Sequence, residues 1–410
     1  MAHSTNASSS PGHGAFPPSP VLDSLPTGHA LLNAVAQDDK AILDLTDAYF
    51  IRTREIVERF GDCDVTYAVF LRRPVVAACG LAHRWLEAVS RRQGFQVEVR
   101  DLYSEGAWVG AGEPLFYLKG RFSKLAPLET LLLQKIGPTC VAAHNAYQMA
   151  MALPHVPFLA MDARHCTGAA MQEQMAYAAA VGSRAAQREG AKGFIGNAND
   201  QTAPFFGLNQ GLGTMPHALV GYAGSTLRAA EMFVERFPDQ PLTILVDYFG
   251  QEATDALAVC NRFADKARAG QISVRLDTHG SRYFEGLDPQ TSYEVLERHV
   301  PGTLRRYRSE KELRYLVGAG VSAAAIWRLR EVLDEAGFGA VKIVASSGFS
   351  VAKCVVMNDA KAPLDVVGTG SFLPETWGET YATADVVAYD GRPLVKKGRE
   401  FLLNKLSAAR

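Results

Sequence analysis

Residues that could bind a charged or hydroxylated ligand stand at the ends of five short apolar runs. They are Asp162, Arg164 and His165 after VPFLAM, Asp247 at the end of LTILVD, Arg275 and Asp277 in ISVRLD, Ser346, Ser347 and Gly348 after AVKIVA, and Gly368, Thr369 and Gly370 at the end of PLDVV. Carboxylates, arginines and imidazoles can hold hydroxyl groups, phosphates or a hydrated cation. These residue types therefore indicate binding of a phosphorylated substrate, provided that the fold brings them together.

The surrounding elements predict that it does. Apolar runs without alternation are typical of strands buried on both faces, and they occur at 156–161, 242–247, 272–277, 340–345 and 363–368. Helical patterns separate most of them, at 167–188, 225–236, 251–266 and 322–336, with N-caps at Ser225 and Ser322 and a stop at Gly337. This alternation predicts an α/β fold with a parallel sheet, as an irregular barrel whose strand C-terminal ends share one rim.

Two loops late in this series predict a phosphate site. Glycine lets a phosphate approach backbone N–H groups closely, and barrels often bind phosphate through the loops after their final two strands. SSG at 346–348 and GTG at 368–370 stand at those positions. Either could be an ordinary glycine-rich turn, but the adjacent pair favours phosphate binding.

GLGTMPHAL, residues 211–219, is a second focus of polar chemistry. Pro216 suits the first turn of a helix, which places His217 beside free backbone N–H groups that favour anions. An imidazole there could carry or contact a phosphoryl group through a neutral ring nitrogen. The alternative is a structural histidine that hydrogen-bonds the turn.

The aspartates and arginines at the strand ends could each have one of two roles. Asp247 and Asp277 could hold ribose hydroxyls or hydrated Mg²⁺, or they could cap helices. Arg164 and Arg275 could bind a carboxylate or phosphate bidentately, or they could pair with neighbouring aspartates. Cys166, which follows a histidine, is a minor candidate for a nucleophile.

The chain patterns also predict a domain organisation. We expect a disordered tail at 1–25, an N-terminal α+β domain at 26–150, the α/β barrel at 151–370 and a C-terminal segment at 371–410 that returns to the N-terminal domain. Within the N-terminal domain, helices are predicted at 38–60, 75–92 and 125–152, and strands at 65–74, 96–103 and 114–119.

Charge and hydropathy argue against several classes of partner. The formal net charge of −1 gives no reason to expect nucleic acid or an anionic membrane. No apolar run approaches the ~18 residues needed to span a bilayer, and the N-terminus does not read as a secretory signal. The six cysteines form no CxxC pair, which favours free thiols in a reducing compartment, with the cytoplasm as the default.

A set of motifs resembles the nicotinate phosphoribosyltransferase family, which is related to the nicotinamide and quinolinate enzymes. From about residue 40 to 398 these are LTDAYF, VTYAVFLRRP, GAGEPLFYLKG followed by LETLLLQ, GTMPHAL, VRLDTHGSR and DVVGTGS. GTMPHAL and RLDT followed by SR look closest to the archaeal-type branch. The resemblance implies an irregular barrel of the type II phosphoribosyltransferase kind behind an N-terminal α+β domain. It also implies a homodimer or larger homo-oligomer with shared active sites.

The resemblance further implies a reaction and roles for individual residues. The reaction joins nicotinate to phosphoribosyl pyrophosphate, with Mg²⁺ as cofactor and ATP as co-substrate. His217 would match the histidine that ATP phosphorylates, and Tyr49 of LTDAYF would match the aromatic that stacks on the pyridine from a second subunit. The implied substrate-binding residues are Tyr49, Arg164, His165, Thr214, Asp247, Arg275, Asp277, Ser347, Gly348, Gly368 and Thr369.

Three segments depart from the family pattern. MDARHC has His165 in place of the second arginine of FGxRR, VDYFGQ keeps only Asp247 of DTYD, and DTHG puts His279 into the DSGD turn. The loss of the second arginine affects how the carboxylate of the pyridine substrate would be held, and therefore which pyridine is used, more than it affects the type of reaction. Quinolinate or nicotinamide phosphoribosyltransferase activity, and a catalytically silent nucleotide-binding relative, are the alternatives.

Overall fold

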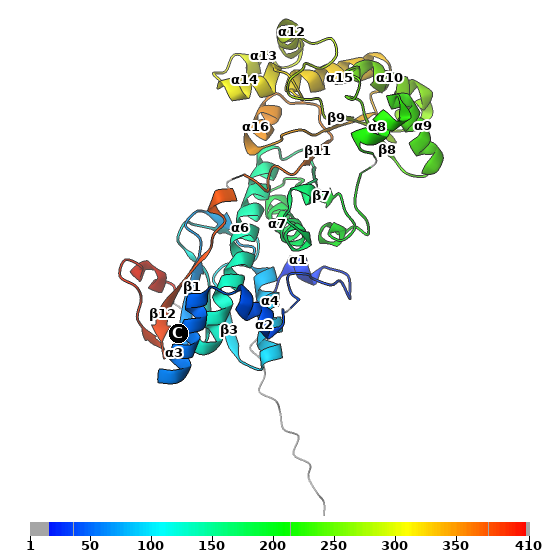
Figure 1. The fold of residues 1–410 in the computed structure, drawn as a ribbon. Helices are drawn as coiled ribbons and strands as arrows, with labels where there is room; N and C mark the ends of the chain where they lie inside the picture. The colour runs from blue at the N-terminus through cyan, green and yellow to red at the C-terminus, as the bar shows by residue number, and fades with distance from the viewer. Residues whose placement is uncertain (1–15, 36, 214, 376, 407–410) are drawn as a thin grey trace, which may run out of the picture. The chain divides into compact units, whose positions relative to one another are not determined.

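The computed structural model describes residues 16–35, 37–213, 215–375 and 377–406. The chain divides into two units, and Figure 1 labels their helices and strands. The first unit comprises Met1–Asp23, Thr27–Val141 and Gly378–Arg410, and the second comprises Ser24–Pro26 and Ala142–Trp377. The main divisions therefore fall at 141/142 and 377/378, whereas the sequence patterns placed them at 150/151 and 370/371.

The first unit is built on an antiparallel sheet with the order β13-β12-β1-β5-β3. The C-terminal strand β12 pairs with β1 from Val65↔Tyr389 to Phe70↔Thr383, so the end of the chain completes the sheet of its beginning. The strands of this unit are β1 (Asp64–Phe70), β2 (Val75–Val76), β3 (Val97–Asp101), β4 (Trp108–Val109), β5 (Pro114–Arg121), β12 (Thr383–Tyr389) and β13 (Arg392–Pro393).

The C-terminal segment also lies against a helix of this unit. A Cβ atom added to Gly137 would stand 1.6 Å from the carbonyl oxygen of Thr380, so only glycine fits there. The helices are α1 (Pro20–Asp23), α2 (Asp39–Leu45), α3 (Ala48–Phe60), α4 (Gly80–Gln93), α5 (Phe122–Leu125) and α6 (Glu129–Ala152), within which the division between the units falls.

Three predictions for the first unit were wrong in detail. The helix expected at 38–60 is two helices, because Thr46 adopts an extended backbone (φ −89°, ψ 140°) and its hydroxyl donates to the carbonyl of Pro127 at 2.7 Å. The helix expected at 75–92 starts only at Gly80, after β2 has paired with β4. In the predicted tail, Pro20–Asp23 form α1, where Val21 and Leu22 are buried.

The second unit contains a six-stranded parallel sheet with the order β7-β6-β11-β10-β9-β8. In the described residues β7 and β8 do not pair with each other, so hydrogen bonds do not close the ring. The strands are β6 (Phe158–Ala160), β7 (Phe194–Asn197), β8 (Leu242–Leu245), β9 (Ile272–Leu276), β10 (Lys342–Ala345) and β11 (Val366–Thr369). The predicted α/β fold with a parallel sheet is confirmed, and β7 is a strand that the sequence patterns missed.

Helices alternate with these strands as predicted. Ser225 and Ser322 accept hydrogen bonds from the N–H groups of Arg228 and Ala325, which confirms both N-caps. The helices are α7 (Ala169–Arg188), α8 (His217–Ala223), α9 (Thr226–Arg236), α10 (Glu252–Arg262), α11 (Ala264–Arg268), α12 (Pro289–His299), α13 (Pro301–Leu304), α14 (Glu310–Val317), α15 (Ala323–Glu335) and α16 (Val351–Asp359).

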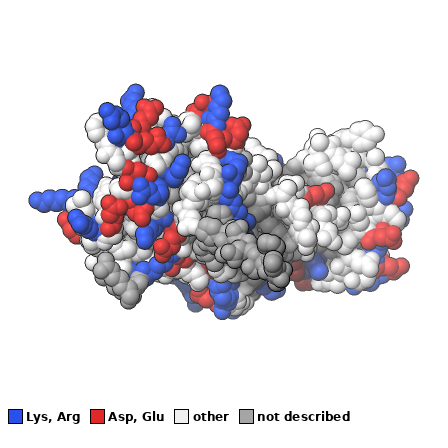
Figure 2. All heavy atoms as spheres, turned by 90° about the horizontal axis from the view of Figure 1, so that it is seen from below, with Lys and Arg blue, Asp and Glu red and all other residues white. Residues whose placement is uncertain are grey.

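Surface charge is mixed. Lysine and arginine side chains are interspersed with aspartate and glutamate on the face drawn in Figure 2, in keeping with the net charge of −1. Among the described residues, no helix combines the length and apolar character needed to cross a bilayer.

Candidate functional site

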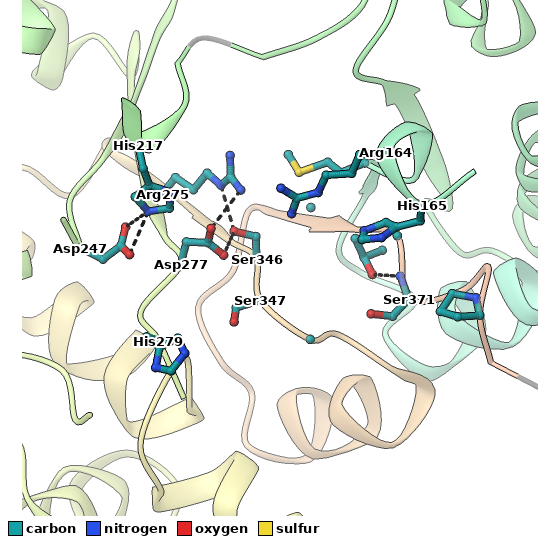
Figure 3. Close-up of a pocket in the computed structure, with 16 residues that line it drawn as sticks. Arg164, His165, His217, Asp247, Arg275, Asp277, His279, Ser346, Ser347 and Ser371 are labelled. Atoms are coloured by element: carbon teal, nitrogen blue, oxygen red, sulfur yellow. Dashed lines mark hydrogen bonds and ion pairs between the residues drawn. The ribbon is translucent and has the colours of Figure 1, made fainter. Parts of the chain in front are cut away.

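A cavity of about 620 Å³ lies in the second unit, where the C-terminal ends of its parallel strands meet (Figure 3). Ten of the twelve predicted site residues line it. Its lining consists of Met161, Arg164, His165, His217, Asp247, Arg275, Asp277, His279, Ser346, Ser347, Gly348, Gly368, Thr369, Gly370, Ser371 and Pro374. The convergence expected from the positions of these residues after the strands is therefore present.

The centre of the cavity wall is a hydrogen-bonded group from β9 and the loop after β10. The Ser346 hydroxyl donates to Asp277 Oδ1 at 2.7 Å and accepts from Arg275 Nε at 2.9 Å. Arg275 Nη2 also lies 3.4 Å from Asp277 Oδ2, so the ion pair considered as an alternative is real. Both charged side chains remain about one-fifth exposed, which leaves them accessible to a ligand as well. Ser346 is the residue that fixes their relative orientation.

A second pair joins α8 to the loop after β8. His217 is the first residue of α8, and its Nε2 lies 3.0 Å from both carboxylate oxygens of Asp247. Burial raises the pKa of Asp247, and the neighbouring His217 opposes that rise. The Asp247 carboxylate can only accept a hydrogen bond, so the neutral imidazole carries its proton on Nε2. Nδ1 is then unprotonated and keeps its lone pair. His217 is thus an oriented imidazole, and Asp247 does not cap the following helix.

A buried glutamate ties the loops after β8 and β9 together. Glu252 is fully buried, and it accepts from the Thr278 hydroxyl at 2.8 Å and pairs with Arg282 at 2.6 Å. Arg282 also donates to the carbonyl oxygen of Asp247 at 2.7 Å. Because a buried charge must be paired and hydrogen-bonded, this network holds the strand ends that carry Asp247 and Asp277.

The loops after β10 and after β11 both line the cavity. Ser347 (φ 78°) and Gly348 (φ 62°) both adopt the left-handed conformation after β10, and both are exposed at the cavity. After β11, the Thr369 hydroxyl donates to the carbonyl of Phe349 at 3.2 Å and accepts from the Ser371 N–H at 3.1 Å. This hydroxyl therefore joins the two loops.

The glycines of the second loop allow close packing against the loop after β6. A Cβ atom on Gly368 would stand 2.7 Å from Met161 Cε, and one on Gly370 would stand 3.1 Å from Asp162 Cα. The loop after β6 therefore lies directly against the loop after β11. Contact with Met161 and Asp162 is therefore one reason for glycine at these positions, and close approach of a phosphate stays a prediction.

The loop after β6 brings Arg164 and His165 to the opposite side of the cavity from His217, and both are exposed (Figure 3). Asp162 beneath them is buried, which raises the pKa of its carboxyl to about 6. Burial and the nearby Asp162 raise the pKa of the Cys166 thiol to about 12. Cys166 is therefore a neutral thiol near pH 7, which argues against the minor nucleophile hypothesis.

Two predicted residues do not line this cavity. Tyr49 belongs to the first unit, where it lies on α3 beside a separate cavity of about 700 Å³. Thr214 lies outside the described residues. The lining residues that are not among the twelve predicted site residues are Met161, His279, Ser346, Gly370, Ser371 and Pro374. Four of these six lie within two positions of a predicted residue, so extending each loop by two positions could have found all but Met161 and Pro374.

Comparisons with known proteins identify the fold. No family model and no curated protein matches this chain. Among solved structures, nicotinate-nucleotide pyrophosphorylase from Pyrococcus furiosus is 23% identical with a TM-score of 0.64, over 89% of this chain and 80% of that one. Human nicotinic acid phosphoribosyltransferase is 16% identical with a TM-score of 0.56, over 85% of this chain and 76% of that one. Nicotinate-nucleotide pyrophosphorylase from Ehrlichia chaffeensis is 11% identical with a TM-score of 0.51, over 85% of this chain and 96% of that one.

These likenesses concern the fold. The chain has an α/β fold of the type II phosphoribosyltransferase kind, as the resemblance in the sequence implied.

Proposed function

We propose that this chain is a nicotinate phosphoribosyltransferase, which forms nicotinate mononucleotide from nicotinate and phosphoribosyl pyrophosphate with hydrolysis of ATP. The observation that carries the proposal is the single cavity that combines two anion-binding loops with aspartates and arginines at strand ends. The fold shared with structures named for nicotinate and its nucleotide supports it. The product would enter NAD biosynthesis.

The cavity suggests how the sugar phosphate would be held. The 5′-phosphate would accept hydrogen bonds from the N–H groups of the loops at Ser347–Gly348 and Gly368–Thr369. The ribose hydroxyls would donate to Asp277 and Asp247, and Arg275 would face the pyrophosphate.

An adjoining cavity of about 530 Å³ offers a place for the pyridine ring. It shares Arg164, His217 and Arg275 with the first cavity, and its further lining is largely apolar: Ala163, Ala198, Leu212, Met215, Pro216 and Leu245. A flat apolar ring with one carboxylate suits a wall of this kind with Arg164 at its edge. His165 would add a second, weaker contact for the carboxylate.

The proposed bond change needs little proton transfer. The pyridine nitrogen attacks the anomeric carbon as the bond from that carbon to pyrophosphate breaks, and both electrons of this bond leave with the pyrophosphate. A neutral pyridine has no proton to lose, so positioning and charge stabilisation supply the rate enhancement. Arg275 would stabilise the charge that develops on the leaving group.

Mg²⁺ fits the donors that the cavity offers. No cluster of three or more His, Cys, Asp or Glu side chains that could hold a metal ion occurs in the described part of the chain. Mg²⁺ is commonly bound through one or two carboxylates, water and substrate phosphates, and Asp247 and Asp277 provide such carboxylates. When bound, the ion would add positive charge beside the leaving pyrophosphate.

His217 would couple the reaction to ATP. Its imidazole begins α8, whose N-terminal N–H groups favour an anionic phosphoryl group, and Asp247 holds the proton on Nε2. Nδ1 would attack the terminal phosphorus of ATP, the bond from that phosphorus to the bridging oxygen would break, and ADP would leave. Asp247 would stabilise the positive charge that the imidazole gains.

A second subunit would complete the pyridine site. None of the residues of α3 is buried, and its exposed face carries Tyr49, Ile56 and Phe60, of which the last is 83% exposed. We propose that a second copy of the chain covers this face, so that Tyr49 reaches the cavity of that copy. Such apolar exposure on one helix is typical of an interface.

Subunit mixing tests this arrangement. Tyr49→Ala and Asp277→Asn homodimers are each expected to be nearly inactive, because one lacks the stacking ring and the other lacks the cavity carboxylate. Each heterodimer of the two variants contains one intact site and one doubly altered site. Unfolding and refolding the two variants together makes about half of the dimers heterodimers, so up to about a quarter of wild-type activity should return. Equal mixing without any recovery would contradict a shared site. Tyr307→Ala, at a fully exposed tyrosine of the second unit, is the matched control.

A product assay tests the function itself. Purified protein with phosphoribosyl pyrophosphate and Mg²⁺ is incubated with nicotinate, nicotinamide or quinolinate, each with and without ATP. We expect nicotinate mononucleotide from nicotinate, with stimulation by ATP. Product from quinolinate with release of carbon dioxide would favour the quinolinate enzyme instead. Binding of phosphoribosyl pyrophosphate without turnover of any base would favour the silent relative.

A further inference from the structure

A buried lysine lies behind the first phosphate loop and does not line the cavity. Lys353 is the third residue of α16 and is 5% exposed. Its Nζ donates to the carbonyl oxygen of Ser347 at 2.8 Å and lies 4.4 Å from the ring centroid of Phe349 and 5.8 Å from that of Tyr315. The ion pairs found among the described residues include none to Lys353.

Burial of an ammonium group in this way is costly. A charge removed from water normally needs a partner of opposite sign at close range, and one carbonyl oxygen with two aromatic faces compensates only partly. Burial lowers the pKa of Lys353 to about 8, while the more distant Asp277 favours the charged form. The local environment is therefore one in which a bound anion would supply the missing counter-charge.

The hydrogen bond from Lys353 also acts on the backbone of the loop. Ser347 has a left-handed conformation, which a residue with a Cβ atom rarely adopts. A trans peptide unit points its N–H opposite to its C=O, so holding the Ser347 carbonyl directs the Gly348 N–H away from Lys353. Gly348 lines the cavity, and under the proposed function its N–H would be one of the groups that bind the phosphate.

We propose that Lys353 is a positioning residue of the phosphate loop and the buried counter-charge for the anion bound there. It fixes the Ser347–Gly348 peptide through the carbonyl, and its positive charge attracts the phosphate from behind the loop. The identity of the ligand as the 5′-phosphate of phosphoribosyl pyrophosphate rests on the proposed function. The anion site itself rests on the loop and the lysine.

Binding to three variants tests the inference. Lys353→Met removes the charge and the donor with little change in volume, Lys353→Arg keeps both, and Lys342→Met makes the same change at an exposed lysine of β10. Calorimetry with inorganic phosphate and with phosphoribosyl pyrophosphate is expected to show affinity reduced about tenfold or more in Lys353→Met. Lys353→Arg should retain most of the affinity, and Lys342→Met all of it.

Steady-state kinetics separate this role from general damage to the fold. Lys353→Met should raise KM for phosphoribosyl pyrophosphate and leave KM for the base near its wild-type value. Its melting temperature should not fall, because a poorly compensated buried charge has been replaced by an apolar side chain. Unchanged phosphate affinity in a folded Lys353→Met protein would overturn the inference.

Proton uptake by the unaltered protein gives a second measurement. Besides Asp277 at the end of β9, the titratable groups near Lys353 are Cys354 on its own helix and Tyr315 on α14. An anion at the loop would raise the pKa of Lys353, so phosphate binding near pH 8 should take up protons, and less should be taken up as the pH falls toward 6. Binding enthalpies in two buffers of different ionisation heat measure this uptake, and its absence near pH 8 would contradict the counter-charge.

The outcomes distinguish this inference from the proposed function. If the unaltered protein binds phosphate and Lys353→Met binds it weakly, but no base is converted, the lysine assignment stands and the proposed activity fails. If nicotinate is converted and Lys353→Met behaves as the unaltered protein, the activity stands and the lysine assignment fails. If the unaltered protein binds neither phosphate nor phosphoribosyl pyrophosphate, both fail.

Discussion

Replacement of His217 with alanine is expected to abolish the stimulation of nucleotide formation by ATP. The imidazole is the group held by Asp247 at 3.0 Å with its Nδ1 lone pair available, and alanine offers no nucleophile. The rate without ATP should stay within about tenfold of the wild-type rate without ATP, because the loops and Arg275 are untouched. Initial rates with and without ATP, together with transfer of label from terminally labelled ATP to the protein, measure both effects.

His155→Ala is the matched control for this experiment. His155 is an exposed histidine of the same unit and is absent from the cavity lining, so ATP stimulation and labelling should persist in that variant. Unchanged ATP stimulation in His217→Ala would remove the phosphohistidine assignment. Labelling of His217→Ala to the wild-type extent would place the acceptor elsewhere.

Replacement of Asp277 with asparagine is expected to lower kcat by roughly 10²–10³-fold with little change in stability. The carboxylate accepts from Ser346 with one oxygen and faces the Arg275 guanidinium with the other. Asparagine has one acceptor oxygen, so its amide N–H₂ must turn either toward the Ser346 hydroxyl or toward a cation. The orientation of Arg275 and the charge offered to the ribose or Mg²⁺ would both be lost.

Steady-state kinetics and thermal unfolding of Asp277→Asn check this expectation. Asp265→Asn, at an exposed aspartate of α11, should retain wild-type kinetics. Activity of Asp277→Asn within threefold of wild type, when the protein is saturated with Mg²⁺, would show that this carboxylate has no part in the chemistry.

The cavity wall was the part of the site most accessible to sequence reasoning. Arg275 and Asp277 are two residues apart at the end of a buried strand, so the period of a strand places their side chains on the same side. Parallel strands then bring the ends of β8, β9, β10 and β11 to one edge. The order of apolar runs and the polar residues after them is enough to predict this convergence.

Other features depend on contacts that are distant in sequence. The break between α2 and α3 comes with a hydrogen bond from Thr46 to Pro127, and nothing within residues 38–60 requires it. β7 is short and contains the exposed Ile195, so no continuous apolar run marks it. Lys353 stands in an apolar helix where a lysine would be expected to extend into solvent, and only the three-dimensional packing shows that it is buried.

The pairing of β12 with β1 has a consequence for how the protein is made. A ribosome synthesises β1 before the second unit and β12 after it, so one edge of β1 stays without its partner while the whole second unit is produced. An unpaired strand edge can recruit another chain, and contacts this remote in sequence form slowly. The nascent first unit should therefore be the segment most prone to aggregate or to require a chaperone, and chains that terminate before residue 383 should fail to accumulate in a dispersed form.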